Sequence, residues 1–144
     1  MRRVLILCTG NSARSQMAEG LLRRLGGAAY DVYSAGTRPV IVNPLAIEAM
    51  REIGMDISSH RSKSVAEFDG QRFDTVITVC DSAAEQCPIF PGAPWRIHWS
   101  LPDPAAVGGT QEEKLAAFRA VRTTLETRLR EFLARPVVKS KNEE

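Results

Sequence analysis

The chain is poor in cysteine and histidine, and neither sign of charge predominates among its 144 residues. Its three cysteines are an odd number for a disulfide framework, and its two histidines leave a Cys/His zinc site poorly specified. The formal net charge is +2 and no stretch concentrates Lys and Arg, so the sequence offers no surface for nucleic acid. These absences leave the thiols as the chemistry-bearing groups, and we expect them to act as nucleophiles or redox centres without a bound metal.

Long hydrophobic runs are also absent. The apolar segment 4–7 follows two arginines, as in a signal peptide, but it stops at Cys8, short of the ~7–15 residues of a signal core. No other segment is long enough to span a bilayer. We therefore expect a cytoplasmic protein outside the membrane. We also expect a monomer, folded as one domain over residues 1–136 with a flexible tail at 137–144.

The apolar residues that are present follow strand and helix patterns in alternation. Strands are predicted at residues 4–7, 30–34, 73–79 and 95–99. Helices are predicted at residues 13–25, from the Asn43-Pro44 cap to Gly54, as a short turn opened by Ser64, and from the Thr110 capping box to a point before Pro136. This alternation indicates an α/β fold: a four-stranded parallel sheet flanked by helices in a flavodoxin-like three-layer sandwich.

Three chemically distinctive residues follow strands of this predicted sheet. Cys8 follows the first strand, Cys80 ends the third, and Asp103 comes shortly after the fourth. In an open parallel sheet, ligands bind beyond the carboxyl ends of the strands at a topological switch point. We therefore expect these residues, distant in sequence, to converge on one edge of the sheet.

The segment from Cys8 to Ser15 is the strongest candidate for a site. Five residues separate Cys8 from Arg14, and a loop of this length between a strand and a helix can wrap backbone N–H groups around a tetrahedral oxyanion. Arg14 supplies a two-pronged donor, while Gly10 and Asn11 tolerate the positive φ of a tight loop. The same surroundings, with the Ser15 hydroxyl, favour a reactive Cys8 thiolate. A buried structural cysteine and a solvent-facing arginine are the alternative interpretation.

The sequence CTGNSARSQMAEG at residues 8–20 resembles the low-molecular-weight tyrosine phosphatase superfamily, and more narrowly its thioredoxin-coupled arsenate reductases. The likeness covers nearly the whole chain. Its other matching segments are VYSAG at 32–36, Asn43-Pro44, GMDIS at 54–58, Cys80, Cys87, His98-Trp99 and Asp103-Pro104.

The resemblance implies a low-molecular-weight phosphatase-like fold and a role for each matching residue. Cys8 is implied to be the nucleophile, Ser15 to tune it, and Asp103 to protonate the leaving oxygen. The implied oxyanion loop consists of Thr9, Gly10, Asn11, Ser12, Ala13, Arg14 and Ser15. The implied substrate is arsenate, and the implied external reductant is thioredoxin.

Cys80 and Cys87 resemble the resolving pair of these reductases. Reducing arsenate to arsenite takes two electrons, which two thiols supply on becoming a disulfide. Cys80 would displace arsenite from Cys8, and Cys87 would then take over the disulfide and present it to thioredoxin. The pattern Ser82-x-x-Glu85 predicts a helix between the thiols. Since seven helical residues span ~10 Å and a disulfide needs α-carbons within ~4.4–6.8 Å, this segment is predicted to unwind on oxidation.

The resemblance also bears on a monovalent cation. Some family members hold one beside the loop, with groups that match Asn11, Glu19 and Ser34, and they carry an acidic residue where this chain has Lys63. The ammonium group of Lys63 can occupy that space itself. No tightly bound cofactor is expected.

Other functions remain open at this stage. A tyrosine phosphatase would hydrolyse phosphomonoesters through a Cys8 phosphoenzyme, but such enzymes usually carry a tyrosine after the Asp-Pro pair, where this chain has Ala105 and Ala106. A reductase with another thiol donor is a further possibility. A module that only binds an oxyanion would need neither Asp103 nor the Cys80–Cys87 pair.

The remaining candidates have structural interpretations of comparable weight. His60 is either a hydrogen-bond partner of Asn11 that holds the loop or a structural histidine. His98 lies inside the fourth strand and is interpreted as structural. Trp95 and Trp99 share one strand face, which indicates core packing.

Overall fold

The computed structural model describes residues 1–92 and 94–135; the predicted tail at 137–144 lies outside them. It contains a four-stranded parallel sheet in the order β2-β1-β3-β4, as the sequence predicts. The elements in chain order are β1 (Arg2–Cys8), α1 (Arg14–Gly26), η1 (Gly27–Ala29), β2 (Tyr30–Gly36), α2 (Pro44–Arg51), η2 (Val65–Phe68), β3 (Thr75–Thr78), α3 (Asp81–Glu85), β4 (Trp95–His98), η3 (Pro104–Ala106) and α4 (Gln111–Ala134).

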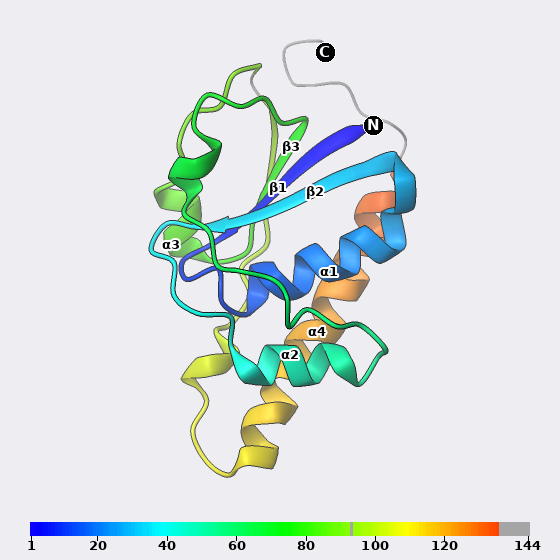
Figure 1. The fold of residues 1–144 in the computed structure, drawn as a ribbon, viewed down its shortest axis with the longest axis vertical. Coiled ribbons are helices and arrows are strands. Elements are labelled where there is room, and N and C mark those ends of the chain that lie inside the picture. The colour runs from blue at the N-terminus through cyan, green and yellow to red at the C-terminus, as the bar shows by residue number, and fades with distance from the viewer. Residues whose placement is uncertain (93, 136–144) are drawn as a thin grey trace.

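The first strand lies in the middle of the sheet, between β2 and β3 (Figure 1). Residues 4–7 are completely buried, because helices cover β1 on both faces. The chain leaves β1 toward β2 and later returns to β3 on the other side. The carboxyl ends of β1 and β3 therefore form the switch point of the sheet, where a ligand site is expected.

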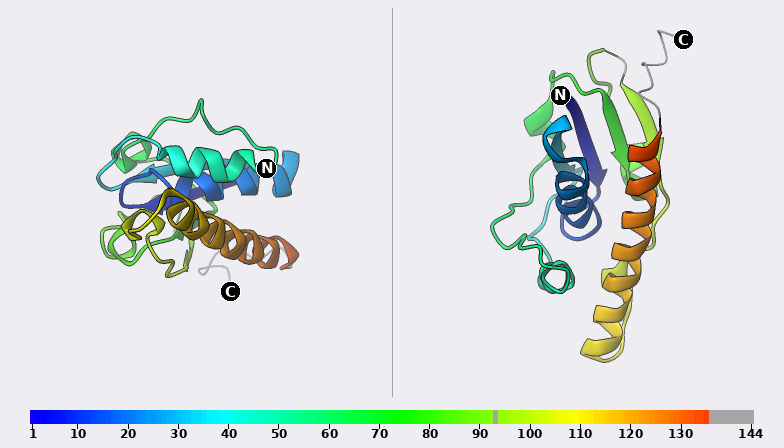
Figure 2. Two further views of the ribbon diagram at one scale, coloured as in Figure 1. Left: turned by 90° about the horizontal axis from the view of Figure 1, so that it is seen from below. Right: turned by 90° about the vertical axis from the view of Figure 1, so that its right-hand side faces the viewer.

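Aromatic contacts identify the two faces of the sheet. Tyr30 and Trp95 pack against Phe132 of α4, with ring centroids 6.0 and 6.4 Å away. On the opposite face, Tyr33 packs against Phe68 of η2 at 5.6 Å. Figure 2 shows α4 on the same side of the sheet as α1, which it contacts. The interpretation of Trp95 as a core-packing residue is confirmed, since it is half-buried against the core.

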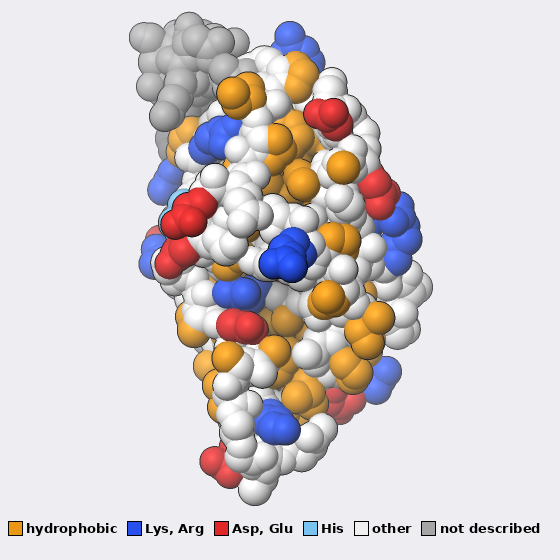
Figure 3. Space-filling model, turned by 90° about the vertical axis from the view of Figure 1, so that its left-hand side faces the viewer, with side chains coloured by type: hydrophobic (Ala, Val, Ile, Leu, Met, Phe, Trp, Pro, Cys, Tyr) orange, Lys and Arg blue, Asp and Glu red, His pale blue; other side chains and the backbone are white. Residues whose placement is uncertain are grey.

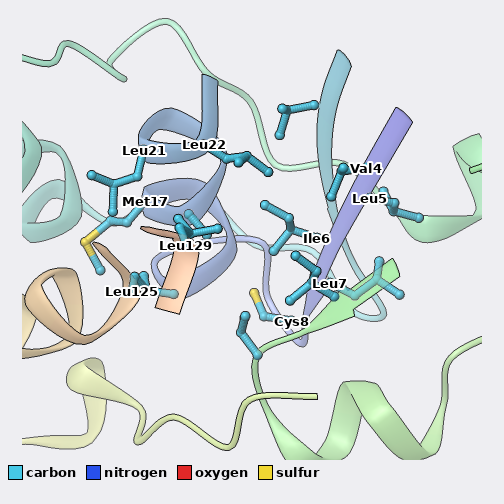
Figure 4. Close-up of a cluster of buried hydrophobic side chains, with 14 of the residues drawn as sticks. Val4, Leu5, Ile6, Leu7, Cys8, Met17, Leu21, Leu22, Leu125 and Leu129 are labelled. Atoms are coloured by element: carbon cyan, nitrogen blue, oxygen red, sulfur yellow. The ribbon is translucent and has the colours of Figure 1, made fainter. Parts of the chain in front are cut away.

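The main core lies between the sheet and the pair α1 and α4. Met17 and Leu21 of α1 lie close to Leu125 and Leu129 of α4, and Cys8 lies at the end of β1 beside them (Figure 4). Each fully buried leucine contributes roughly 1.5–3 kcal/mol through removal of its apolar surface from water. The predicted stripe of α4 is confirmed, because each of its members is buried or half-buried: Leu115, Phe118, Val121, Leu125, Leu129 and Phe132.

Helix starts follow the predicted caps with one exception. Asn43 accepts a hydrogen bond from the Leu45 N–H at 2.8 Å, and the Thr110 capping box is present. The expectation that Ser82 caps the short helix before Cys87 is wrong. This helix, α3, already begins at Asp81, so Cys80 itself is the residue that flanks its amino end. The Cys80 thiol therefore lies at a boundary between a strand end and a helix.

The surface carries charges of both signs. On the face drawn in Figure 3, basic and acidic side chains lie interspersed with apolar ones. Within the described ranges, no helix has the length and apolar character needed to cross a membrane.

Candidate active site

Cys8 ends β1 and opens the loop that leads into α1. Its sulfur lies 2.8 Å from the Ser15 hydroxyl and accepts the backbone N–H of Asn11 at 3.2 Å. Cys8 is 2% exposed and Ser15 is fully buried, so both contacts are shielded from water. The predicted Ser15 contact is therefore present. One backbone N–H and one hydroxyl thus meet the Cys8 sulfur at the start of the loop.

The curvature of this loop depends on Asn11. Asn11 has φ 48°, and its side-chain amide donates to the hydroxyls of Ser15 at 2.8 Å and Ser34 at 2.9 Å. These bonds hold an asparagine in the left-handed region, which this residue tolerates better than most. The expectation of a positive φ at Gly10 is wrong. Gly10 instead lies close to Val40, and a β-carbon there would make a tight contact of 3.1 Å with Val40 Cγ2.

Arg14 connects the loop to the segment that carries Asp103. Its Nη1 donates to the Leu101 carbonyl at 2.9 Å, across 87 positions of sequence. Asp103 is exposed, and its carboxylate accepts the Ala105 N–H at 3.0 Å, which caps η3. The structure thus brings Arg14 together with the segment of Asp103, the predicted acid, at one edge of the sheet. In this conformation the Asp103 side chain itself serves as a turn former.

Cys80 lies against the same loop. The Thr9 hydroxyl is 3.2 Å from the Cys80 sulfur, and Cys80 is 5% exposed. Thr9 is the immediate neighbour of Cys8, so a second thiol faces the oxyanion loop as the predicted convergence requires. Since neither cysteine is paired, both are available as thiols.

Cys87 lies beyond the other end of α3. It is half-buried and unpaired, and its thiol donates to the Pro88 carbonyl at 3.6 Å. Burial raises the pKa of the Cys87 thiol, while the positive charge of Arg96 beside it acts in the opposite direction. The predicted helix between Cys80 and Cys87 is present, and its unwinding on oxidation stays a prediction.

Comparison with known proteins places this geometry in a family. The profile of the low molecular weight phosphotyrosine protein phosphatases matches residues 3–143. The chain belongs to that family. An arsenate reductase of Halalkalibacterium halodurans is 47% identical over 129 residues, which cover 90% of this chain and 93% of the relative. An arsenate reductase of Bacillus subtilis is 45% identical with the same coverage.

Solved structures of the phosphatase family share the fold. An arsenate reductase in the oxidized state superimposes with a TM-score of 0.79 at 33% identity, covering 93% of this chain and 98% of the other. The tyrosine phosphatase Wzb from Escherichia coli K30, in complex with sulphate, superimposes with a TM-score of 0.74 at 26% identity, covering 90% and 94%. Reductases and phosphatases therefore share this fold, and the residues of the site must distinguish the two activities.

Behind the predicted oxyanion loop lies a buried polar network centred on Glu19, which is 3% exposed. Ser34 donates to one Glu19 oxygen, and Arg23 Nη1 lies 2.7 Å from the other. Lys63 Nζ is 3.8 Å from Glu19 and donates to the Arg61 carbonyl at 3.0 Å. Burial lowers the pKa of Lys63, and the Glu19 carboxylate partly offsets that effect. Two basic side chains thus compensate the one buried carboxylate.

The groups matched to a monovalent-cation site already have hydrogen-bond partners in the structure. Asn11 Oδ1 already accepts the Lys63 backbone N–H at 2.8 Å and a Gln16 amide N–H at 3.0 Å. Ser34 is bonded to both Asn11 and Glu19, so its hydroxyl is engaged as well. A cation here would have to displace these bonds and would meet the Lys63 ammonium.

His60 acts on the loop indirectly. Of the two interpretations of His60, the direct hydrogen bond to Asn11 is wrong: His60 Nδ1 lies 2.9 Å from Gln16 Oε1, and Gln16 in turn bonds Asn11. Burial lowers the pKa of His60, while the nearby Glu19 carboxylate raises it to a lesser extent. Gln16 is fully buried and was missed, because a glutamine inside an amphipathic helix pattern gives no signal of its own.

Two further residues gain importance from the structure. Gly36 approaches the loop so closely that a β-carbon would lie 2.5 Å from the Thr9 carbonyl. His98, interpreted as structural, bonds Thr78 and Asp81 on either side of Cys80. Neither contact has a local sequence signal, since both join segments far apart in the chain.

Proposed function

We propose that the protein reduces arsenate to arsenite, with Cys8 as the nucleophile and Cys80 and Cys87 as successive resolving thiols. The observation that carries the proposal is the Thr9–Cys80 contact at 3.2 Å, which presses a second buried thiol against the oxyanion loop. A phosphatase has no use for a thiol there, because water releases its phosphoryl group. The named arsenate reductases among the relatives support the same substrate.

In the first step Cys8 attacks arsenate held by the loop. The backbone N–H groups of residues 9–15 and the Arg14 guanidinium face the oxygens on which negative charge develops. Cys8 forms a bond to arsenic, and one arsenic–oxygen bond breaks. Asp103 lies on the segment that Arg14 contacts, and it supplies the proton with which that oxygen leaves as water.

In the second step the Cys80 thiolate attacks the Cys8 sulfur. A sulfur–sulfur bond forms, the sulfur–arsenic bond breaks, and its electron pair stays on arsenic. Arsenic(V) becomes arsenic(III) and leaves as arsenite, while two thiols are oxidised to one disulfide, so the two electrons balance. The Thr9–Cys80 contact supports this step, because it holds a second thiol against the residue that follows Cys8.

In the third step Cys87 attacks Cys80 and releases Cys8 as a thiolate. The Cys80–Cys87 disulfide requires α-carbons within ~4.4–6.8 Å, so α3 must unwind. An external dithiol then reduces this disulfide, and we propose thioredoxin for that role. A Corynebacterium glutamicum relative described as thioredoxin-dependent supports it, with a TM-score of 0.68 at 29% identity over 92% of this chain and 60% of that one.

The direct test is arsenite formation coupled to NADPH oxidation. With thioredoxin and thioredoxin reductase, wild-type protein is expected to turn over arsenate continuously, whereas glutathione with glutaredoxin supports little turnover. Phosphate-ester hydrolysis is measured in parallel. Ester hydrolysis without arsenite formation under either donor would make the protein a phosphatase and would contradict the proposal.

We propose further that Lys63 takes the place of a monovalent cation. Its ammonium already compensates Glu19, which reaches Cys8 through Ser34, Asn11 and Ser15. Replacing potassium by tetramethylammonium at constant ionic strength is therefore expected to leave kcat and KM unchanged.

The matched variant Lys63→Asp is expected to show the opposite behaviour, an activity that depends on potassium. It removes the ammonium and adds a carboxylate, so its activity should fall without potassium and recover as potassium is added. Steady-state assays over a potassium series check both proteins. A wild-type enzyme that responds to potassium as strongly as Lys63→Asp would disprove the role of Lys63.

A further inference from the structure

The edge strand β4 contacts both ends of the segment that carries the resolving cysteines. Trp95 packs on the face of α4, and alternate residues of a strand point to opposite faces. Arg96 and His98 therefore project from the other face, where they contact residues at the two ends of α3.

His98 holds the Cys80 end. Its Nδ1 lies 2.7 Å from the Thr78 hydroxyl, and its Nε2 lies 2.8 Å from the Asp81 carboxylate. Thr78 ends β3 and Asp81 begins α3, so one imidazole ring joins the residues on either side of Cys80. Cys80 has extended backbone angles, φ −147° and ψ 153°, between these two anchored positions. The ring thereby bridges the two positions between which Cys80 lies.

The acceptor of this clamp is an ionised carboxylate. A hydrogen bond from His98 lowers the pKa of Asp81, and one from Ser100 lowers it to a smaller extent. A charged acceptor makes a stronger hydrogen bond than a neutral one, and it requires that Nε2 carry the proton. The position of the Cys80 thiol, with its sulfur 3.2 Å from Thr9, is thus coupled to a side chain of a neighbouring strand.

Arg96 holds the Cys87 end. Its Nη2 donates to the Pro88 carbonyl at 2.7 Å, and its charge opposes the rise in the pKa of Cys87 that burial causes. A cavity of about 210 Å³ lies between this end and the strand, lined in part by Ala84, Cys87 and Arg96. It leaves space beside α3 for side chains to shift when the helix unwinds.

We propose that His98 and Arg96 are positioning residues for two separate exchanges: His98 directs Cys80 at Cys8, and Arg96 stabilises the Cys87 thiolate that attacks Cys80. This inference rests on the proposed arsenate reduction. In the first exchange the Cys8–Cys80 bond forms as arsenite leaves with the electron pair. In the second the Cys80–Cys87 bond forms as Cys8 leaves as a thiolate, with no net oxidation.

The test for His98 is a single turnover without thioredoxin. Arsenate is mixed with reduced protein in a Cys87→Ser background, samples are quenched with acid, and the Cys8–Cys80 disulfide is quantified by mass spectrometry. His98→Ala is expected to slow its formation on the order of 10- to 100-fold, because misplacement of a reacting group by about 1 Å has effects of that size. Asp81→Ala should slow it as well, and Asp81→Asn, which keeps an acceptor oxygen but loses the charge, should give a rate between those of Asp81→Ala and the parent.

The test for Arg96 uses the three-cysteine protein. Arg96→Met is expected to form the Cys8–Cys80 disulfide at the wild-type rate and to transfer it to Cys80–Cys87 more slowly. Protection of Cys8 from iodoacetamide by inorganic phosphate reports on the oxyanion loop, and it should be unchanged in both variants.

These outcomes distinguish a failure of the two positioning roles from a failure of the proposed arsenate reduction. Equal rates in His98→Ala and its parent, or a loss of phosphate protection that accounts for the slower exchange, would overturn the positioning role of His98. A wild-type transfer rate in Arg96→Met would overturn that of Arg96. A parent that forms no Cys8–Cys80 disulfide with arsenate would instead overturn the proposed function, and the inference with it.

Discussion

Replacement of Cys80 by serine is expected to abolish repeated arsenite formation while Cys8 still captures arsenate. The serine hydroxyl can keep the contact with Thr9, but it cannot form a disulfide with Cys8. Loss of a nucleophile that acts as part of a unit reduces turnover on the order of 10⁴-fold or more. The NADPH-coupled assay with thioredoxin measures this loss, and phosphate protection of Cys8 from alkylation shows that the loop still binds an oxyanion.

The matched variant is Cys87→Ser. It retains Cys8 and Cys80, so it should release one equivalent of arsenite per protein and then stop with these two cysteines joined. The two serine variants therefore differ in a single-turnover experiment although both fail in the steady state. Sustained wild-type turnover by Cys80→Ser would refute the relay.

Arg14→Lys is expected to lower kcat/KM for arsenate on the order of 10²- to 10³-fold, the effect of removing one preorganised donor from an oxyanion site. Lysine keeps the positive charge but lacks the planar fork that matches two anion oxygens. It also loses the bond to the Leu101 carbonyl, which links the loop to the segment of Asp103. Steady-state kinetics with arsenate, and with a phosphate ester in parallel, measure both losses.

Arg24→Lys is the control for this substitution. Arg24 lies on the same helix but bonds the carbonyls of Ile53 and Gly54, away from the loop. It should leave kcat/KM unchanged. Equal kinetics of Arg14→Lys and wild type would mean that the guanidinium geometry has no part in catalysis.

Much of the architecture was predictable because its signals are local. Continuous apolar runs specified the strands, and the Asn43 and Thr110 caps marked two helix starts that the structure confirms. The loop from Cys8 to Ser15 was equally accessible, since its chemistry lies within one turn between a strand and a helix. The order of β1 and β3 then placed Cys8 and Cys80 at the same edge.

The errors arose where local propensity allowed several solutions. Gly10 and Asn11 both tolerate a positive φ, and the hydroxyls of Ser15 and Ser34 decide in favour of Asn11. Ser82 has a capping pattern, but the Asp81 carboxylate bonds His98 and the helix begins two residues earlier, with Cys80 at its flank. In each case a bond to another strand, Ser34 for Asn11 and His98 for Asp81, helps to select among conformations of similar local energy.

Periodicity and short motifs act over a few residues, so they were enough to predict the fold class, the oxyanion loop and three thiols suited to redox chemistry. They could not predict which groups meet. The Thr9–Cys80 contact, the clamp of His98 around Cys80 and the compensation of Glu19 by Lys63 all join segments that are far apart in the chain. Such contacts depend on packing of the whole chain, since no short-range pattern encodes the distance between two side chains on different strands.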